Sequence, residues 1–183
     1  TKLQENKTKY GVSVSNGTNA LLIALKALNI GLGDEVITVS NSAIATASSI
    51  ISSGAKIRFI DIGDDYLIDH KQIEKYINKN TKAIIVVHLY GQACEMDEII
   101  KIKKKYKISL IEDCAQAQGA KYKGIIVGNF GDFGCFSFYP TKILGAYGDG
   151  GFITTNNESL YRKARRIRFY GIDNINKKNK WNK

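Results

Sequence analysis

The sequence predicts an α/β domain in which a mostly parallel sheet is sandwiched by helices. Segments that fit strands alternate with segments that fit helices along most of the 183 residues, which is the pattern of βαβ units. Residues 83–87, Ala-Ile-Ile-Val-Val, form a continuous apolar run, as expected of a parallel strand covered on both faces. Residues 20–28 are apolar almost all round, which favours a buried helix. Ligands of such folds bind at the carboxyl ends of the strands.

In the first half of the chain, short segments rich in β-branched residues predict three strands, at residues 12–15, 35–39 and 56–61. Segments of small and apolar residues between them predict two helices, at residues 20–28 and 42–52. A glycine-rich turn at residues 31–34 separates the first helix from the second strand. The order of these elements is therefore strand, helix, strand, helix, strand.

In the second half, charged and apolar residues alternate at helical spacing, which predicts amphipathic helices at residues 69–77, 97–106 and 158–167. Asp69 is a candidate N-cap, and Leu160, Ala164 and Ile167 share one face of the last helix. Further strands are predicted at residues 82–89, 108–113 and 152–155. Residues 131–151 break this alternation, because they are dense in glycine and aromatic residues and include an aromatic strand before Lys142.

The charge of the chain is strongly positive, with 27 Lys and Arg against 17 Asp and Glu and a formal net charge of +10. Such a balance is typical of proteins that bind polyanions. The basic residues are mostly lysines on predicted helix faces, however, and Lys101 and residues 103–105 form one such solvated face. Aromatic residues do not interleave with a basic run, as stacking platforms for bases would require. We therefore expect no nucleic-acid partner, whereas a diphosphate-bearing metabolite is compatible with the charge.

Neither a membrane span nor a metal site is expected. The chain has no apolar run long enough to cross a bilayer, and its first residues show no signal-peptide apolar segment. Its three cysteines fit free core thiols in a reducing compartment, so we expect a cytoplasmic protein. Cys94, Cys114 and Cys135 stand far apart, which argues against disulfides and against a zinc site. The two histidines, His70 and His88, are too few for a histidine-based metal site.

A phosphate site is the first of three candidate features at strand ends. Residues 15–18, Ser-Asn-Gly-Thr, join a strand to a helix, where free backbone N–H groups, the helix dipole and the Thr18 hydroxyl favour an anion. A plain N-cap with a turn glycine is the alternative, and this segment alone favours that alternative. The segment is neither a P-loop nor a G-x-G-x-x-G motif.

A carboxylate and a lysine complete the set. Asp113 ends an apolar strand, where a partly desolvated carboxylate needs a partner such as a protonated ring nitrogen; a helix-capping aspartate is an equally good interpretation. Lys142 lies between an aromatic strand and a glycine-rich turn, so its amine is available for Schiff-base chemistry. Ser137, five residues earlier, is a candidate phosphate ligand. A phosphate site, a buried Asp and an activated Lys are together the requirements of a pyridoxal phosphate site.

Five segments resemble the DegT family of pyridoxal phosphate-dependent nucleotide-sugar aminotransferases, namely residues 16–21, 31–37, 88–92, 112–117 and 136–142. The likeness runs from about Tyr10 to Gly171. It implies that residues 1–171 form a cofactor-binding large domain of fold type I that lacks part of its N-terminus. Residues 172–183 would then be a polar, basic tail leading toward an absent C-terminal domain.

The resemblance also implies roles for individual residues. Lys142 would hold the cofactor covalently and later move a proton, and Asp113 would pair with the pyridine nitrogen. The remaining contacts would come from Gly17, Thr18 and Ser137 at the phosphate, Ala115 against one ring face and Gln116 beside the phenolic oxygen. The implied partners are glutamate, a keto sugar linked to dTDP or UDP and a second copy of the chain. Residues 139–142 together with residues 144–151 are similar to members that aminate carbon 3 of the sugar.

Two positions depart from the family pattern. An aromatic ring that stacks on the cofactor is usual at the position of Ala43, and the residue after the lysine, usually Asn, is Ile143. His88, at the end of its strand, is then the best candidate to cover the open ring face. A sugar dehydratase of the same fold is a rival function, although its lysine is typically replaced by histidine. A catalytically silent fragment or regulatory relative is a second rival, which Ala43 and the missing C-terminal segment favour.

Overall fold

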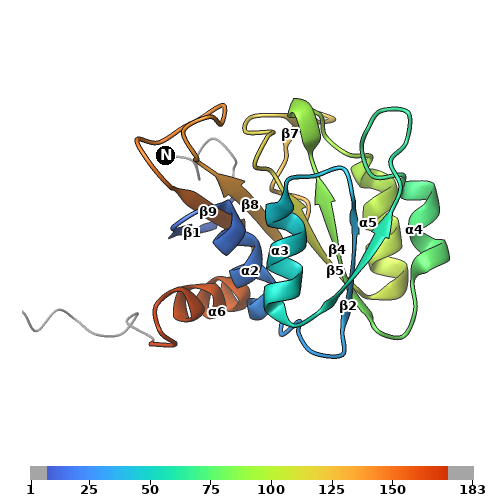
Figure 1. Ribbon diagram of the computed structural model, residues 1–183, viewed down its shortest axis with the longest axis horizontal. Coiled ribbons are helices and arrows are strands. Elements are labelled where there is room, and N and C mark those ends of the chain that lie inside the picture. The colour runs from blue at the N-terminus through green and yellow to red at the C-terminus, as the bar shows by residue number, and fades with distance from the viewer. Residues whose placement is uncertain (1–7, 173–183) are drawn as a thin grey trace, which may run out of the picture.

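The computed structural model describes residues 8–172 as a three-layer α/β/α arrangement (Figure 1). The central sheet has seven strands in the order β1-β9-β8-β5-β4-β2-β3. In chain order these are β1 (Tyr10–Val14), β2 (Glu35–Val39), β3 (Lys56–Ile60), β4 (Thr81–Val87), β5 (Ser109–Asp113), β8 (Phe133–Ser137) and β9 (Gly151–Thr155). Five neighbouring strands run parallel to one another, namely β3, β2, β4, β5 and β8, whereas β9 is antiparallel to both β8 and β1. The predicted α/β fold with a mostly parallel sheet is confirmed.

Helices cover both faces of this sheet (Figure 1). One face carries α2 (Gly17–Ala27), α3 (Ile44–Ser53) and α6 (Glu158–Arg168), and the other carries α4 (His70–Tyr76) and α5 (Met96–Tyr106). Because side chains alternate along a strand, β4 serves both cores: Ala83 and Ile85 pack under α2, while Ile84 and Val86 pack under α5. This double burial explains the continuous apolar run of β4.

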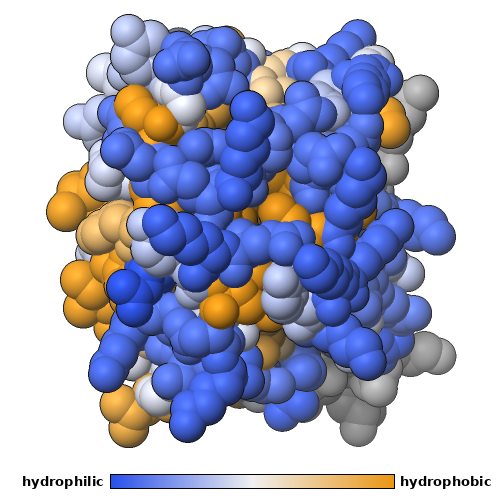
Figure 2. Space-filling model, turned by 90° about the vertical axis from the view of Figure 1, so that its right-hand side faces the viewer, coloured by the Kyte–Doolittle hydropathy of each residue, from blue (hydrophilic) through white to orange (hydrophobic). Residues whose placement is uncertain are grey.

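The side formed by α4 and α5 is mostly hydrophilic, with smaller hydrophobic areas between the polar side chains (Figure 2). On α5, Lys101, Lys104 and Lys105 are exposed, as predicted. Lys103 differs, because it is half-buried and its Nζ lies 2.8 Å from an Asp132 carboxylate oxygen. Within residues 8–172, no helix is long and apolar enough to cross a membrane.

Several local expectations can be compared with the structure. Asp69 caps α4, since its carboxylate accepts a hydrogen bond from the Lys71 N–H at 3.1 Å. All three cysteines are buried and free. Ile167 does not join Ala164 in the core: it lies in the last turn of α6 and is 38% exposed. The expected tail lies outside the described residues except for Ile172, as do residues 1–7.

The sequence analysis missed a small hairpin of β6 (Lys121–Tyr122) and β7 (Ile125–Ile126). Its two turn residues, Lys123 and Gly124, have φ values of 46° and 82°, as a two-residue hairpin turn requires. Asn and Gly are the usual residues at the first turn position, so the lysine at residue 123 gives no indication of a turn in the sequence. A short 3₁₀ turn, η1 (Leu89–Gly91), follows β4.

Candidate active site

A cavity of about 320 Å³ lies where β5 and β8 end and α2 begins, near the upper edge of the sheet in Figure 1. This is the carboxyl edge of the parallel strands, where ligands of α/β folds bind. All but one of the predicted site residues line it, namely Gly17, Thr18, Ala43, Asp113, Ala115, Ser137 and Lys142. Gln116 is the exception, and its predicted role stays untested. The fold thus brings together residues that are up to 125 positions apart, from Gly17 to Lys142.

One end of the cavity has the geometry of an anion site. Helix α2 begins at Gly17, after Asn16, whose side chain accepts a hydrogen bond from the Asn19 N–H at 2.9 Å. The first N–H groups of a helix have no partner inside the helix and carry partial positive charge. The last residue of β8, Ser137, lies directly opposite: a Cβ added to Gly17 would come within 2.8 Å of the Ser137 Cβ. Glycine at residue 17 therefore keeps this end of the cavity open.

Asp113 ends β5 and is almost completely buried, with 5% of its surface exposed. One carboxylate oxygen accepts a hydrogen bond from the Ala115 N–H at 3.1 Å, and the other accepts one from the Thr46 hydroxyl at 2.9 Å. Burial nevertheless raises the pKa of Asp113 above its ordinary value of 3.8, and these two hydrogen bonds oppose that rise only in part. A cation bound in the cavity beside Asp113 would lower this pKa again, so the site is suited to a protonated ring nitrogen.

Lys142 lies in the connection between β8 and β9, which forms a turn in which the Lys142 N–H donates to the Tyr139 carbonyl at 2.8 Å. Its side chain is half-buried, whereas the residues that follow are exposed, including Ile143 and Leu144. The Lys142 amine and the Asp113 carboxylate therefore belong to one cavity although they come from different elements. A half-buried amine beside a desolvated carboxylate is a suitable arrangement for covalent chemistry with proton transfer.

Sequence reasoning assigned no role to Thr46, Tyr139 or Asp149. Thr46 is buried on α3 and hydrogen-bonds Asp113, and Tyr139 and Asp149 line the cavity on either side of Lys142. Buried hydroxyls alone do not single out Thr46, because Ser49 and Ser53 of the same helix are buried too. The directions of Tyr139 and Asp149 depend on the path of the β8–β9 connection, which residue types do not specify.

The expectation that His88 covers a cofactor face is wrong. The ring is fully buried and is not among the residues that line the cavity. Its Nε2 lies 3.1 Å from a Glu112 carboxylate oxygen, and its Nδ1 accepts a hydrogen bond from the Cys94 N–H at 3.1 Å. These two partners hold the His88 ring in the buried core, so it does not face the cavity.

His88, Glu112 and Cys114 place potential metal-ligand atoms within 4.8 Å of one another. These groups already have protein partners. Glu112 accepts hydrogen bonds from the N–H groups of Gly128, Phe130 and Gly131 at 2.6 to 2.7 Å, as well as contacting His88. The cluster is therefore explained as a buried polar network that fixes the loop before β8.

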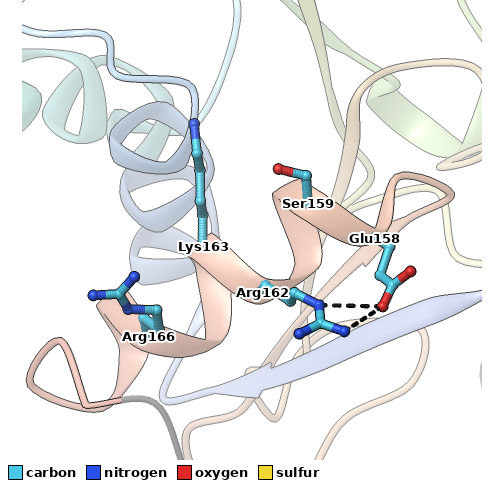
Figure 3. Close-up of a pocket in the computed structure, with 5 residues that line it drawn as sticks. All are labelled: Glu158, Ser159, Arg162, Lys163 and Arg166. Carbon is cyan, nitrogen blue, oxygen red and sulfur yellow. Dashed lines mark hydrogen bonds and ion pairs between the residues drawn. The ribbon is translucent and has the colours of Figure 1, made fainter. Parts of the chain in front are cut away.

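A larger hollow, of about 420 Å³, lies on α6 and is lined by Glu158, Ser159, Arg162, Lys163 and Arg166 (Figure 3). All five residues come from one exposed helix, and Arg162 is paired with Glu158 at 2.6 Å. The hollow contains none of the predicted site residues, so the cavity at the strand ends is the candidate active site.

Residues 4–183 match the sequence model of the DegT/DnrJ/EryC1/StrS aminotransferase family. The chain belongs to this family, which confirms the resemblance seen in its motifs.

Individual relatives agree with this assignment. The chain is 46% identical, over 165 residues, to dTDP-3-amino-3,4,6-trideoxy-alpha-D-glucose transaminase of Micromonospora megalomicea subsp. nigra, covering 90% of this chain and 44% of the relative. It is 49% identical, over 167 residues, to the pleiotropic regulatory protein of Geobacillus stearothermophilus, covering 91% of this chain and 45% of the relative. It is also similar to S. venezuelae DesV, crystallised in complex with a ketimine intermediate, with a TM-score of 0.91, 36% identity and coverage of 98% and 47%. The chain thus spans less than half the length of these relatives.

Proposed function

We propose that this chain is the cofactor-binding large domain of a pyridoxal phosphate-dependent aminotransferase. In this proposal, the whole protein moves an amino group from glutamate to a keto sugar nucleotide. The observation that carries it is the single cavity that Lys142, Asp113 and the start of α2 share. Groups suited to covalent attachment, to pairing with a ring nitrogen and to binding a phosphate line this cavity, and no other cavity described within residues 8–172 combines them.

When bound, pyridoxal phosphate supplies the electron sink that stabilises negative charge at the amino carbon. The chain's own groups perform the remaining tasks. The first N–H groups of α2 and the Ser137 hydroxyl bind the phosphate, and Gly17 leaves the room for it. The Asp113 carboxylate keeps the proton on the ring nitrogen. The Lys142 amine would hold the cofactor covalently and would serve as the group that moves a proton at the amino carbon.

The substrate belongs to the whole protein, so it is part of the proposal. The Micromonospora relative is named for a dTDP sugar with its amino group at carbon 3. Residues 144–151, Leu-Gly-Ala-Tyr-Gly-Asp-Gly-Gly, favour the same position. We infer a dTDP- or UDP-linked hexose that carries a keto group at carbon 3, a cytoplasmic location, and a homodimer in which the partner completes each site.

The rival functions have distinct signatures. A sugar dehydratase is disfavoured by Lys142, but a regulatory or silent protein finds support in the similarity to the pleiotropic regulatory protein.

The purified protein should absorb visible light after addition of pyridoxal phosphate, and glutamate should abolish that absorbance. When keto sugar nucleotides are then added one at a time, only those of the true substrate class should restore the visible absorbance. Binding without any response to glutamate would favour the silent protein, and absence of binding would exclude the proposal.

Replacing Gly17 with alanine should weaken cofactor binding by at least about tenfold, since the new methyl group would lie 2.8 Å from the Ser137 Cβ and narrow the phosphate end. The affinity for pyridoxal phosphate, measured by absorbance titration, checks this. Gly148→Ala is the matched control, because a Cβ at Gly148 meets nothing within 4 Å. Equal losses in both variants would mean that the space at Gly17 is not the phosphate site.

Replacing Ala43 with phenylalanine should tighten cofactor binding. Ala43 is exposed and lines the cavity, so a ring there can stack on the cofactor face that no aromatic residue of this segment covers. Stacking contributes roughly 0.5–1.5 kcal/mol beyond area burial, which corresponds to about tenfold at most. The same titration measures it. Expulsion of the cofactor by Ala43→Phe would mean that another group already fills this face.

A further inference from the structure

The segment that carries Lys142 is held at both ends by one buried side chain. Gln118 has only 9% of its surface exposed. Its amide nitrogen donates a short hydrogen bond to the Ser137 carbonyl, and its amide oxygen accepts one from the Leu144 N–H at 2.9 Å. Ser137 lies five residues before Lys142 and Leu144 lies two residues after it, so the two bonds bracket the lysine.

Gln118 also links this segment to the other catalytic group. It follows Asp113 by five residues, and the connection between them is fixed by backbone hydrogen bonds, from the Cys114 N–H to Cys135 at 2.8 Å and from the Ala117 N–H to Cys114 at 3.1 Å. The segment around Lys142 is otherwise mostly exposed. Backbone bonds also close the segment, from the Phe138 N–H to Gly150 at 2.7 Å and from the Ala146 N–H to Phe138 at 2.8 Å. Gln118 adds a short side-chain link between this segment and the chain that follows Asp113.

Gln118 does not line the cavity, so it does not act on a bound molecule directly. The two contacts also require one donor and one acceptor on the same side chain. One atom must donate to a carbonyl and the other must accept from an N–H, which a neutral amide or a protonated carboxyl group can do. An ionised carboxylate has acceptors only and would repel the Ser137 carbonyl.

We propose that Gln118 is a positioning residue that holds the Lys142 amine at its working distance from Asp113. This inference rests on the proposed function, because it assigns to Gln118 the geometry that covalent attachment of the cofactor needs. It predicts that pyridoxal phosphate becomes linked to Lys142 more slowly when residue 118 cannot make both hydrogen bonds, even in a variant whose fold is as stable as that of wild type.

The test uses Gln118→Glu, whose side chain has the shape of glutamine and, when protonated, the same donor and acceptor. The variant and the wild-type protein are treated with pyridoxal phosphate and borohydride over a range of pH, and the rate of linkage at Lys142 is measured by peptide mass mapping. At about pH 8 the variant should react about tenfold more slowly than wild type. The ratio of the two rates should approach one as the pH falls, since burial raises the pKa of a glutamate and protonation restores the donor. Comparing the ratio removes the pH dependence of the amine itself.

Two further variants keep the test decisive. The methionine of Gln118→Met has a similar size but makes neither hydrogen bond, so linkage at Lys142 should be slow in this variant at every pH. This variant still tests the inference if Gln118→Glu does not fold at high pH. Gln92→Glu, on an exposed residue, is the matched control and should behave as wild type. A Gln118→Met variant that links at the wild-type rate would overturn the inference.

A second measurement separates this inference from the proposed function. In cofactor-free protein, the rate of Lys142 acetylation and the amide exchange of Leu144 should both change in Gln118→Met. If wild-type Lys142 is never linked to pyridoxal phosphate, the proposed function fails, and the acetylation and exchange rates alone decide whether Gln118 holds the lysine. Unchanged rates in that experiment would refute the role of Gln118.

Discussion

Replacing Lys142 with alanine should abolish the covalent attachment of pyridoxal phosphate while leaving the fold intact. The side chain lies in the connection between β8 and β9 and packs into neither of the two large cores on the faces of the sheet, so its loss removes little buried apolar surface. The amine, by contrast, cannot be replaced by another group in the cavity, since no other lysine among residues 8–172 lines it. Borohydride treatment followed by mass measurement should therefore find no cofactor on the variant, and circular dichroism should match wild type.

The control for this experiment is Lys104→Ala, which removes an exposed amine from α5 on the far side of the sheet. That variant should retain attachment at Lys142. Attachment of the cofactor to a different lysine in wild type would exclude the assignment, even if the overall stoichiometry were correct.

The strands of the central sheet could be predicted from the sequence because their buried positions are occupied by apolar residues. The strand predicted at residues 35–39 is β2 with the same bounds, and the run at residues 83–87 lies within β4. Parallel strands covered on both faces must be apolar throughout, and that requirement is visible in a single sequence. The same logic located Asp113, since a charged residue that ends such a strand lies at the edge where ligands bind.

The rest depended on contacts between segments that no local pattern encodes. Thr46 reaches Asp113, and Gln118 reaches Leu144, only because the sheet brings α3, β5 and the β8–β9 connection together. His88 was misjudged for a related reason: a residue just after a strand can turn to either face, and here the buried Glu112 carboxylate provides its partner. Polar residues whose partners are distant in sequence are therefore the ones that a single sequence leaves open.

Replacing Asp113 with asparagine should weaken cofactor binding strongly without destabilising the cofactor-free chain at neutral pH. Asparagine keeps the acceptor for the Ala115 N–H and can donate to the Thr46 hydroxyl, so the local hydrogen bonds survive. The lost interaction is a charge-assisted hydrogen bond to a protonated ring nitrogen, worth about 1.5–3 kcal/mol, or roughly ten- to hundredfold in affinity. Absorbance titration with pyridoxal phosphate measures this loss. Asp64→Asn, on an exposed loop, should change neither affinity nor stability.

The pH dependence of stability separates this role from a simple cap. Because burial raises the pKa of Asp113 above 3.8 in the folded chain, the folded state holds this proton more tightly than the unfolded state does. The contribution of Asp113 to stability is therefore most favourable below the unfolded pKa and falls as the pH rises through the window up to the folded pKa. Asparagine does not titrate, so the free energy of unfolding of Asp113→Asn should rise relative to wild type across that window, as urea unfolding of the cofactor-free proteins would measure. A capping carboxylate would have a lowered pKa and the opposite trend, so a variant that loses stability relative to wild type as the pH rises would show that Asp113 serves the fold and not the cofactor.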